Sequence, residues 1–240
     1  MKRSRKRRAF VKVARNALRA RRMPKLQGKR RRTIACYALV MSRSFPERFV
    51  RHLATVAIHK TYVFLYCAYA GMPFRGLMHD WSKLSPTEFL ESVKYFNGRS
   101  SPVGICREIE GCSLAWLHHK GRNKHHYEYW QDFVSESGTF SMTPNMIFPL
   151  PMPYRYALEM ICDTIAASRA YNGSRFSYDL LVQWWLNYSK IPINMHPQTK
   201  RFVQAMFKEL HREGNCRALR RSKEIYDRAQ LEPTLENLED

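Results

Sequence analysis

Two segments of this 240-residue chain combine a Ser-x-x-Glu pattern with an early proline, which is a strong signal for the start of an α-helix. Ser44 precedes Glu47 by three positions, Ser85 precedes Glu88 in the same way, and a proline lies inside each interval. A serine hydroxyl at the N-cap accepts a backbone N–H of the first turn, where proline is also tolerated. The apolar residues that follow have helical spacing, and no segment alternates convincingly with period two. The sequence therefore predicts an all-α fold.

The same capping and periodicity signals predict a series of helices along the chain. The segment 135–153 is rich in Ser, Pro, Gly and Met and is expected to be an irregular connection. The last two helices are strongly charged. The expected helices cover residues 44–71, 85–97, 103–119, 123–130, 153–172, 178–188, 198–212 and 216–230.

Basic residues are concentrated at the N-terminus. Residues 1–32 contain 16 Lys or Arg and no Asp or Glu, whereas the other 208 residues carry 25 basic and 20 acidic side chains. We therefore expect a basic arm over residues 1–43, disordered on its own, and one helical domain over residues 44–240. Three interpretations of the arm stay open: a nucleic-acid or membrane-surface segment, an organelle-targeting presequence, and a merely solvated extension.

The six cysteines are scattered without a CxxC pair, which fits neither a zinc ribbon nor a disulfide scaffold. A reducing compartment follows, and a cytoplasmic location is expected, with organelle targeting through the basic N-terminus as the alternative. The most apolar stretch, residues 53–72, is interrupted by His59 and Lys60. Because a spanning helix needs about 20 mostly apolar residues, no membrane span is predicted.

Histidines and carboxylates fall at the ends or on the inner faces of successive predicted helices. Imidazole and carboxylate ligands together suit Mn, Fe, Co, Ni or Zn, so the pattern predicts a divalent transition-metal site. His79 and Asp80 are adjacent, and both can face one ion where the backbone turns at a helix end. We expect one ion, with a second as the alternative. The candidates are His59, His79, Asp80, His118, His119, His125, His126 and Asp163.

The segment HDWSK at residues 79–83 resembles the hallmark of the HD superfamily, in which a histidine, a later His-Asp pair and a distant aspartate hold a catalytic metal. His59 precedes the pair by 20 residues, and Asp163 follows on a later predicted helix, in the order of that superfamily. The resemblance implies an HD-like helical bundle. It also implies that His59, His79, Asp80 and Asp163 are the ligands of the metal.

HD proteins with a second metal have two further histidines before the last aspartate. Here the resemblance implies one histidine from the pair His118 and His119 and one from the pair His125 and His126. We assign His118 and His126 as ligands and expect the other two histidines to contact substrate, although spacing does not decide between the members of each pair.

Residues 59–200 also resemble an uncharacterised bacterial and phage family of unknown function, DUF5662. The matching segments are HDWSKLSPTEF at 79–89, AWLHHKGRNKHHYEYW at 115–130 and MPYRYALEMICD at 152–163. These long runs are specific for membership in the family. They transfer no reaction to this chain, and the basic N-terminus lies outside them.

Roles in hydrolysis follow from the metal pattern. Asp80 would bind metal and orient the attacking water, while Lys83, Arg122 and Lys124 would meet a phosphate group. Glu159 lies four residues before Asp163, so it shares a helix face with that ligand and would orient a ligand or act as a base.

Three functions are consistent with these residues. The first is a metal-dependent phosphohydrolase acting on a nucleotide or other phosphate ester. The second is a di-iron oxygenase of the HD type, which would use the same ligand order on an organic substrate. The third is a nucleic-acid-binding protein that uses residues 1–32 and carries a structural metal site. The sequence does not predict an oligomeric state.

Overall fold

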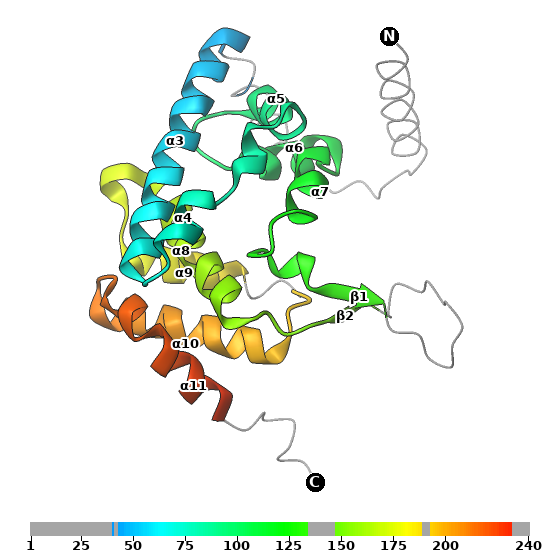
Figure 1. Ribbon diagram of the computed structural model, residues 1–240. Helices are drawn as coiled ribbons and strands as arrows, with labels where there is room; N and C mark the ends of the chain where they lie inside the picture. Colours follow the sequence, from blue (N-terminus) through cyan, green and yellow to red (C-terminus); the bar gives the residue numbers. More distant parts are fainter. Residues whose placement is uncertain (1–39, 41–42, 134–146, 189–192, 232–240) are drawn as a thin grey trace.

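The computed structural model describes residue 40 and residues 43–133, 147–188 and 193–231. Over these residues the chain is helical apart from one pair of short strands, so the predicted all-α class is confirmed (Figure 1). The predicted basic arm lies almost entirely outside the described residues, as does most of the predicted irregular connection.

The helices and strands follow one another along the chain in the order given by their residue ranges. The α-helices are α3 (Phe45–Tyr69), α4 (Pro73–Met78), α5 (Pro86–Tyr95), α6 (Pro102–Glu110), α7 (Leu114–Lys120), α8 (Tyr154–Asn172), α9 (Tyr178–Tyr188), α10 (Pro197–Glu213) and α11 (Ser222–Leu231). Short 3-10 helices are η1 (Trp81–Leu84), η2 (Tyr127–Tyr129), η4 (Gly173–Arg175) and η5 (Arg217–Arg221). Strands β1 (Gln131–Phe133) and β2 (Ile147–Pro149) pair in antiparallel register.

Both predicted Ser-x-x-Glu starts are helix N-termini. The Ser44 hydroxyl accepts the backbone N–H of Glu47 at 3.4 Å at the start of α3, and the Ser85 hydroxyl accepts that of Glu88 at 3.4 Å at the start of α5. Each bond satisfies one of the N–H groups that a first helical turn leaves without a partner. The predictions for these two helix starts are confirmed.

Two predicted helices in the middle of the chain are wrong. The helix expected over residues 103–119 is two helices, because Gly111 takes a left-handed conformation with φ of 84° and ends α6, and Ser113 then caps α7. The helix expected from Asn123 is absent: residues 121–126 form turns, followed only by η2. The Asn123 amide donates to the backbone oxygen of His119 at 2.8 Å, which holds the chain in a turn after α7.

The main core lies between α8 and the elements that surround it. α8 packs along α3, and α9, α10 and α11 cover its other side (Figure 1). Leu158, Ile161 and Ile165 of α8 are fully buried in this core, together with Phe202 and Met206 of α10. Burying each of these side chains contributes about 1.5–3 kcal/mol, so α8 is a rigid support for residues on its remaining face.

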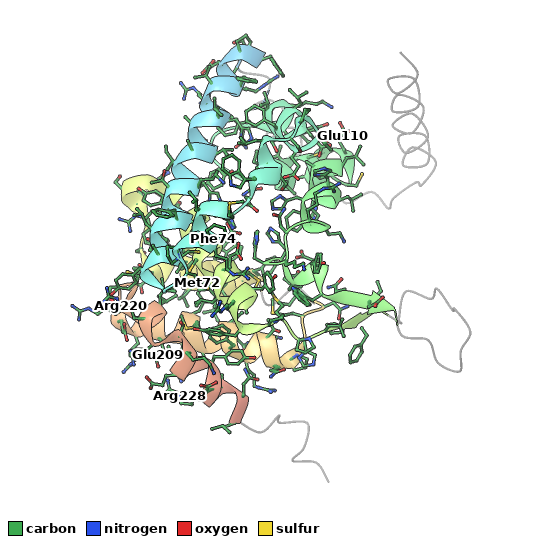
Figure 2. All side chains as sticks on the ribbon, in the orientation of Figure 1. Met72, Phe74, Glu110, Glu209, Arg220 and Arg228 are labelled. Carbon is green, nitrogen blue, oxygen red and sulfur yellow. The ribbon has the colours of Figure 1, made fainter. Side chains whose placement is uncertain are left out.

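The charged C-terminal helices lie on the far side of this core from α7 (Figure 2). Arg228 of α11 lies 3.8 Å from Glu209 of α10, and Arg221 pairs with Glu213. These ion pairs join α10 to the segment that follows it. Among the described residues, no helix is both long and apolar enough to cross a membrane.

The short helix α4 lies unusually close to α3 because Gly76 has no side chain. A Cβ atom at Gly76 would lie 2.8 Å from the Cα of Phe64 and 2.8 Å from the Cβ of Cys67, both on α3. These distances are below van der Waals contact, and the Phe64 atom belongs to the backbone. Gly76 therefore permits the approach that brings the end of α4, and His79 after it, over α8.

We expect Gly76→Ala to destabilise the protein by about 1–3 kcal/mol, because the new methyl group pushes α4 away from α3. Gly104→Ala in α6 is the matched control, since no described atom outside the neighbouring residues and the backbone of the same helix lies within 4 Å of the position that its new methyl group would take. The control is expected to be neutral or to stabilise by about 0.5–1 kcal/mol, as helical Gly-to-Ala changes do. Urea unfolding of both variants measures the difference. Equal stabilities would contradict the close packing of α4.

Candidate metal centre

An unusual backbone conformation brings His79 and Asp80 to the same point. His79 ends α4 in an extended conformation, and Asp80 follows with φ of 52° and ψ of 37°, the left-handed region. Among the described residues, Asp80 is the only one other than glycine with positive φ. Aspartate tolerates this conformation better than most residues, at a cost of about 1–2 kcal/mol. As a result, His79 Nε2 lies 3.1 Å from Asp80 Oδ2, and both side chains are fully buried.

Four side chains from three parts of the chain form a first group of candidate ligands. His59 comes from α3, His79 and Asp80 from the turn after α4, and Asp163 from α8. One N or O atom from each lies within 4.8 Å of all the others. Asp163 Oδ1 is 3.1 Å from His59 Nε2 and 3.4 Å from His79 Nε2. Ligand atoms that share one ion at about 2.1 Å lie at about this separation from each other.

A second group contains Asp80 again, with three histidines of the α7 region. His119 Nε2 and His125 Nε2 each lie 3.4 Å from Asp80 Oδ1. His119 Nε2 is also 2.9 Å from His126 Nε2. Two of these histidines, His125 and His126, lie in the turns where the sequence predicted a helix. The turn allows adjacent histidines to face the same point, which a regular helix does not.

Asp80 is the residue common to both groups. Its Oδ2 atom faces His79 of the first group, and its Oδ1 atom faces His119 and His125 of the second. Five buried atoms around it form no hydrogen bond of good geometry among the described residues: His79 Nε2, both Asp80 oxygens, His125 Nε2 and Asp163 Oδ1. Two of these atoms still have a charged or ionisable neighbour, because Asp80 Oδ2 forms an ion pair with Lys83 and Asp163 Oδ1 lies 3.1 Å from His59 Nε2. Buried polar atoms without a partner are costly and uncommon. The described side chains therefore form buried clusters that could hold metal ions, as the sequence predicted in outline.

Carboxylates behind the histidines fix the orientation of three rings. Glu159 Oε1 lies 3.0 Å from His79 Nδ1 and 3.4 Å from His125 Nδ1, so one carboxylate serves both groups. Glu88 Oε2 lies 2.7 Å from His119 Nδ1. A carboxylate that holds Nδ1–H leaves the Nε2 lone pair free for a metal ion, as at many metal sites.

The charge states of most of these groups suit metal binding. Burial alone would raise the pKa of Asp80 and Asp163. The charge of His79 holds the pKa of Asp80 well below its usual range, and hydrogen bonds from His59 and His79 do the same for Asp163. Burial lowers the pKa of His125 to about 4, and burial with the adjacent His125 lowers that of His126 well below its usual range. Ionised carboxylates and neutral imidazoles are the forms that bind metal.

His79 is the exception among the candidate ligands. Burial opposes its protonation, but the carboxylates of Asp80, Asp163 and Glu159 outweigh burial and raise its pKa well above the usual value. A protonated His79 must release the Nε2 proton before that atom binds an ion. Metal uptake by this group is therefore coupled to proton release.

Lys83 places a positive charge against the shared carboxylate. Its Nζ lies 2.6 Å from Asp80 Oδ2 and 3.3 Å from His59 Nε2, and its side chain is 31% exposed. Burial would lower the pKa of Lys83, but Asp80 and Asp163 outweigh it and raise the value. Lys83 is therefore a permanent cation at the accessible side of the cluster.

The structure places the other predicted site residues outside the two groups. His118 Nδ1 lies 2.5 Å from Glu88 Oε1 and belongs to neither group, whereas the adjacent His119 belongs to the second. Arg122 donates to the backbone oxygen of His118, and the Lys124 ammonium lies 5.8 Å from the Tyr129 ring. The expected phosphate contacts of Arg122 and Lys124 gain no support from these positions.

Two residues of the site were missed from the sequence. Glu88 was interpreted as a capping-box residue, but its side chain pairs with the histidines of α7 while its backbone N–H meets Ser85. Arg75 Nη1 lies 2.8 Å from Glu159 Oε2 and fixes that carboxylate. The burial of Glu88 would have indicated its role in the site. Burial depends on the fold, however, so the sequence alone gave no signal for this role.

Comparison with protein families identifies the family of this chain. The family model described as "Family of unknown function (DUF5662)" matches residues 48–209. The chain belongs to this family. The match runs from α3 into α10 and includes every residue of both groups. No curated protein and no solved structure matches the chain. No function is assigned to DUF5662, so a functional proposal for this chain depends on the geometry of the site.

We expect Glu159→Ala to destabilise the protein by about 3 kcal/mol, because it leaves Arg75 and His79 without their buried carboxylate. Urea unfolding in the presence of a chelator measures this cost without any contribution from metal. Glu224→Ala, at an exposed position of α11, is the control and should change stability by less than about 0.5 kcal/mol. A loss below about 1 kcal/mol for Glu159→Ala would show that this carboxylate does not hold the cluster together.

Proposed function

We propose that this protein is a metal-dependent phosphohydrolase that holds two divalent transition-metal ions and acts on a nucleotide or other phosphate ester. The observation that carries the proposal is the position of Asp80, whose two oxygens face two separate groups of imidazoles. A carboxylate shared in this way is suited to bridge a pair of ions. The ions would be Mn, Fe, Co, Ni or Zn, which mixed nitrogen and oxygen ligands prefer.

The proposed ligands of the first ion are His59, His79, Asp80 and Asp163. Those of the second are Asp80, His119, His125 and His126. Glu159 and Glu88 act as positioning residues, because each holds the Nδ1 side of ligand histidines rather than facing the shared point. The hydrogen bond with His79, the charge of His125 and the pairing with Arg75 outweigh burial and lower the pKa of Glu159, which argues for the orienting role over the base role.

Two divalent ions at this centre would lower the pKa of a bound water and polarise a phosphoryl oxygen. The protein's own contribution to phosphate binding begins with Lys83, whose side chain is partly exposed and whose ammonium, beside Asp80, would contact an anionic oxygen of the substrate. A cavity of about 620 Å³ reaches His126 and Asp163, so a molecule in it would have access to both ligand groups.

The di-iron oxygenase is the second candidate, because the same ligands would serve iron. Oxygen uptake with an organic substrate, in place of phosphate release, would favour it. The nucleic-acid-binding alternative depends on residues 1–32, which lie outside the described residues.

We expect the purified protein to contain close to two ions per chain and Asp80→Ala to lose most of both, since Asp80 is common to the two groups. His119→Asn should lose one ion, whereas His118→Asn, changed at the adjacent position, should keep two. Elemental analysis measures the stoichiometry, and circular dichroism checks the fold. No metal in the wild type, before or after reconstitution, would refute the metal centre. Equal losses in the two histidine variants would refute the ligand assignment.

We expect the protein reconstituted with Mn, Fe or Co to release phosphate from a panel of nucleotides and generic phosphate esters. Asp80→Ala should lower kcat by more than about 100-fold, because loss of a shared ligand exceeds the usual effect of a residue behind the ligands. Phosphate release measures the reaction, and an oxygen electrode run in parallel tests the oxygenase. Metal-loaded protein that releases no phosphate from any ester would contradict the proposal.

A further inference from the structure

A second cavity adjoins the cavity that reaches the metal centre. The second cavity has a volume of about 400 Å³ and shares Arg99, Tyr171 and Asn172 with the first. Its other lining residues are Gly98 and Arg175. His126 and Asp163 therefore line the larger cavity, and two arginines line the smaller cavity that adjoins it.

The two arginines are exposed, lie on short turns and have no anionic partner among the described residues. The Asn97 side chain accepts the backbone N–H of Arg99 at 2.8 Å and fixes the turn after α5, and Arg175 ends η4 directly after α8. Within the described part of the chain, neither guanidinium forms an ion pair or a hydrogen bond, and the 400 Å³ cavity has no carboxylate in its lining. Two like charges facing one cavity without a counter-charge are suited to bind an anion between them.

The wall of the larger cavity is mainly apolar and aromatic. Trp116, Trp184 and Trp185 contribute to it, and Trp184 stacks on Tyr188 with ring centroids 5.3 Å apart. Trp184 is half exposed and lines this cavity. A planar or apolar body would bury this surface.

We propose that the substrate is an organic phosphate with a second anionic group, and that Arg99 and Arg175 bind this second group while its ester lies at the metal centre. This inference deepens the proposed function and rests on it for the reacting end. The cavity of about 620 Å³ lies within the usual range for ligand sites and accommodates a nucleotide-sized body. Arginines favour phosphate because their N–H groups donate in pairs to its oxygens. The class is therefore a bisphosphate of a nucleoside or of a similar aromatic body.

The test compares wild type with the double variant Arg99→Gln and Arg175→Gln, and with Arg217→Gln as the control. Arg217 is exposed on η5 and lines neither cavity. Calorimetry of chelator-treated protein measures binding of adenosine 3′,5′-bisphosphate without any contribution from metal. We expect the double variant to bind at least about 10-fold more weakly than wild type, because it loses two charge-assisted donors, and the control to bind equally. Equal binding by wild type and the double variant, or no binding by either, would overturn the inference.

A second measurement separates this inference from the proposed reaction. In metal-loaded protein, the double variant should raise KM for the bisphosphate at least about 10-fold and leave kcat/KM for p-nitrophenyl phosphate, which has no second anion, unchanged. If the double variant binds the bisphosphate more weakly than wild type but the metal-loaded wild type releases no phosphate, the anion site is supported and the phosphohydrolase is refuted. If phosphate is released and the double variant has an unchanged KM for the bisphosphate, the phosphohydrolase is supported and the anion site is refuted.

Discussion

The carboxylate of Asp80 is the point on which the rest of the site depends. Both of its oxygens face imidazole nitrogens, and it reaches them only because its own backbone is left-handed. That conformation is placed by α4, which in turn lies close to α3 only because Gly76 lacks a side chain. The packing of α3 and α8 around Asp80 compensates for the free-energy cost of this backbone conformation, as is typical of strained residues at functional sites.

The sequence predicted those parts of the structure that depend on local chemistry. The helix starts at Ser44 and Ser85 were correct because a cap and a proline act within one turn. The sequence could not decide between His118 and His119 as a ligand. Which of them faces the site depends on the rotation of α7 about its axis, and α7 is a separate helix because Gly111 ends α6. Continuous helical periodicity from residue 103 could not reveal this break.

Other features could not be predicted because one residue has two roles, and only one of these roles is visible in the local sequence. Glu88 follows Ser85 at the capping-box spacing, so the sequence alone assigned it fully to the start of α5. Its side chain instead spans His118 and His119, which lie 30 and 31 positions later in the chain. The unpaired state of Arg99 and Arg175 was equally out of reach, because it depends on which acidic residues fold against them.

The long sequence separations within the site bear on how the protein folds. His79 and Glu159 are 80 positions apart, and α3 meets α8 across a similar stretch of chain. Closing such long loops costs chain entropy, and these contacts raise the contact order of the fold. No short fragment of the chain contains a complete ligand group, and tight metal binding would accordingly report that the whole helical domain has reached its native arrangement.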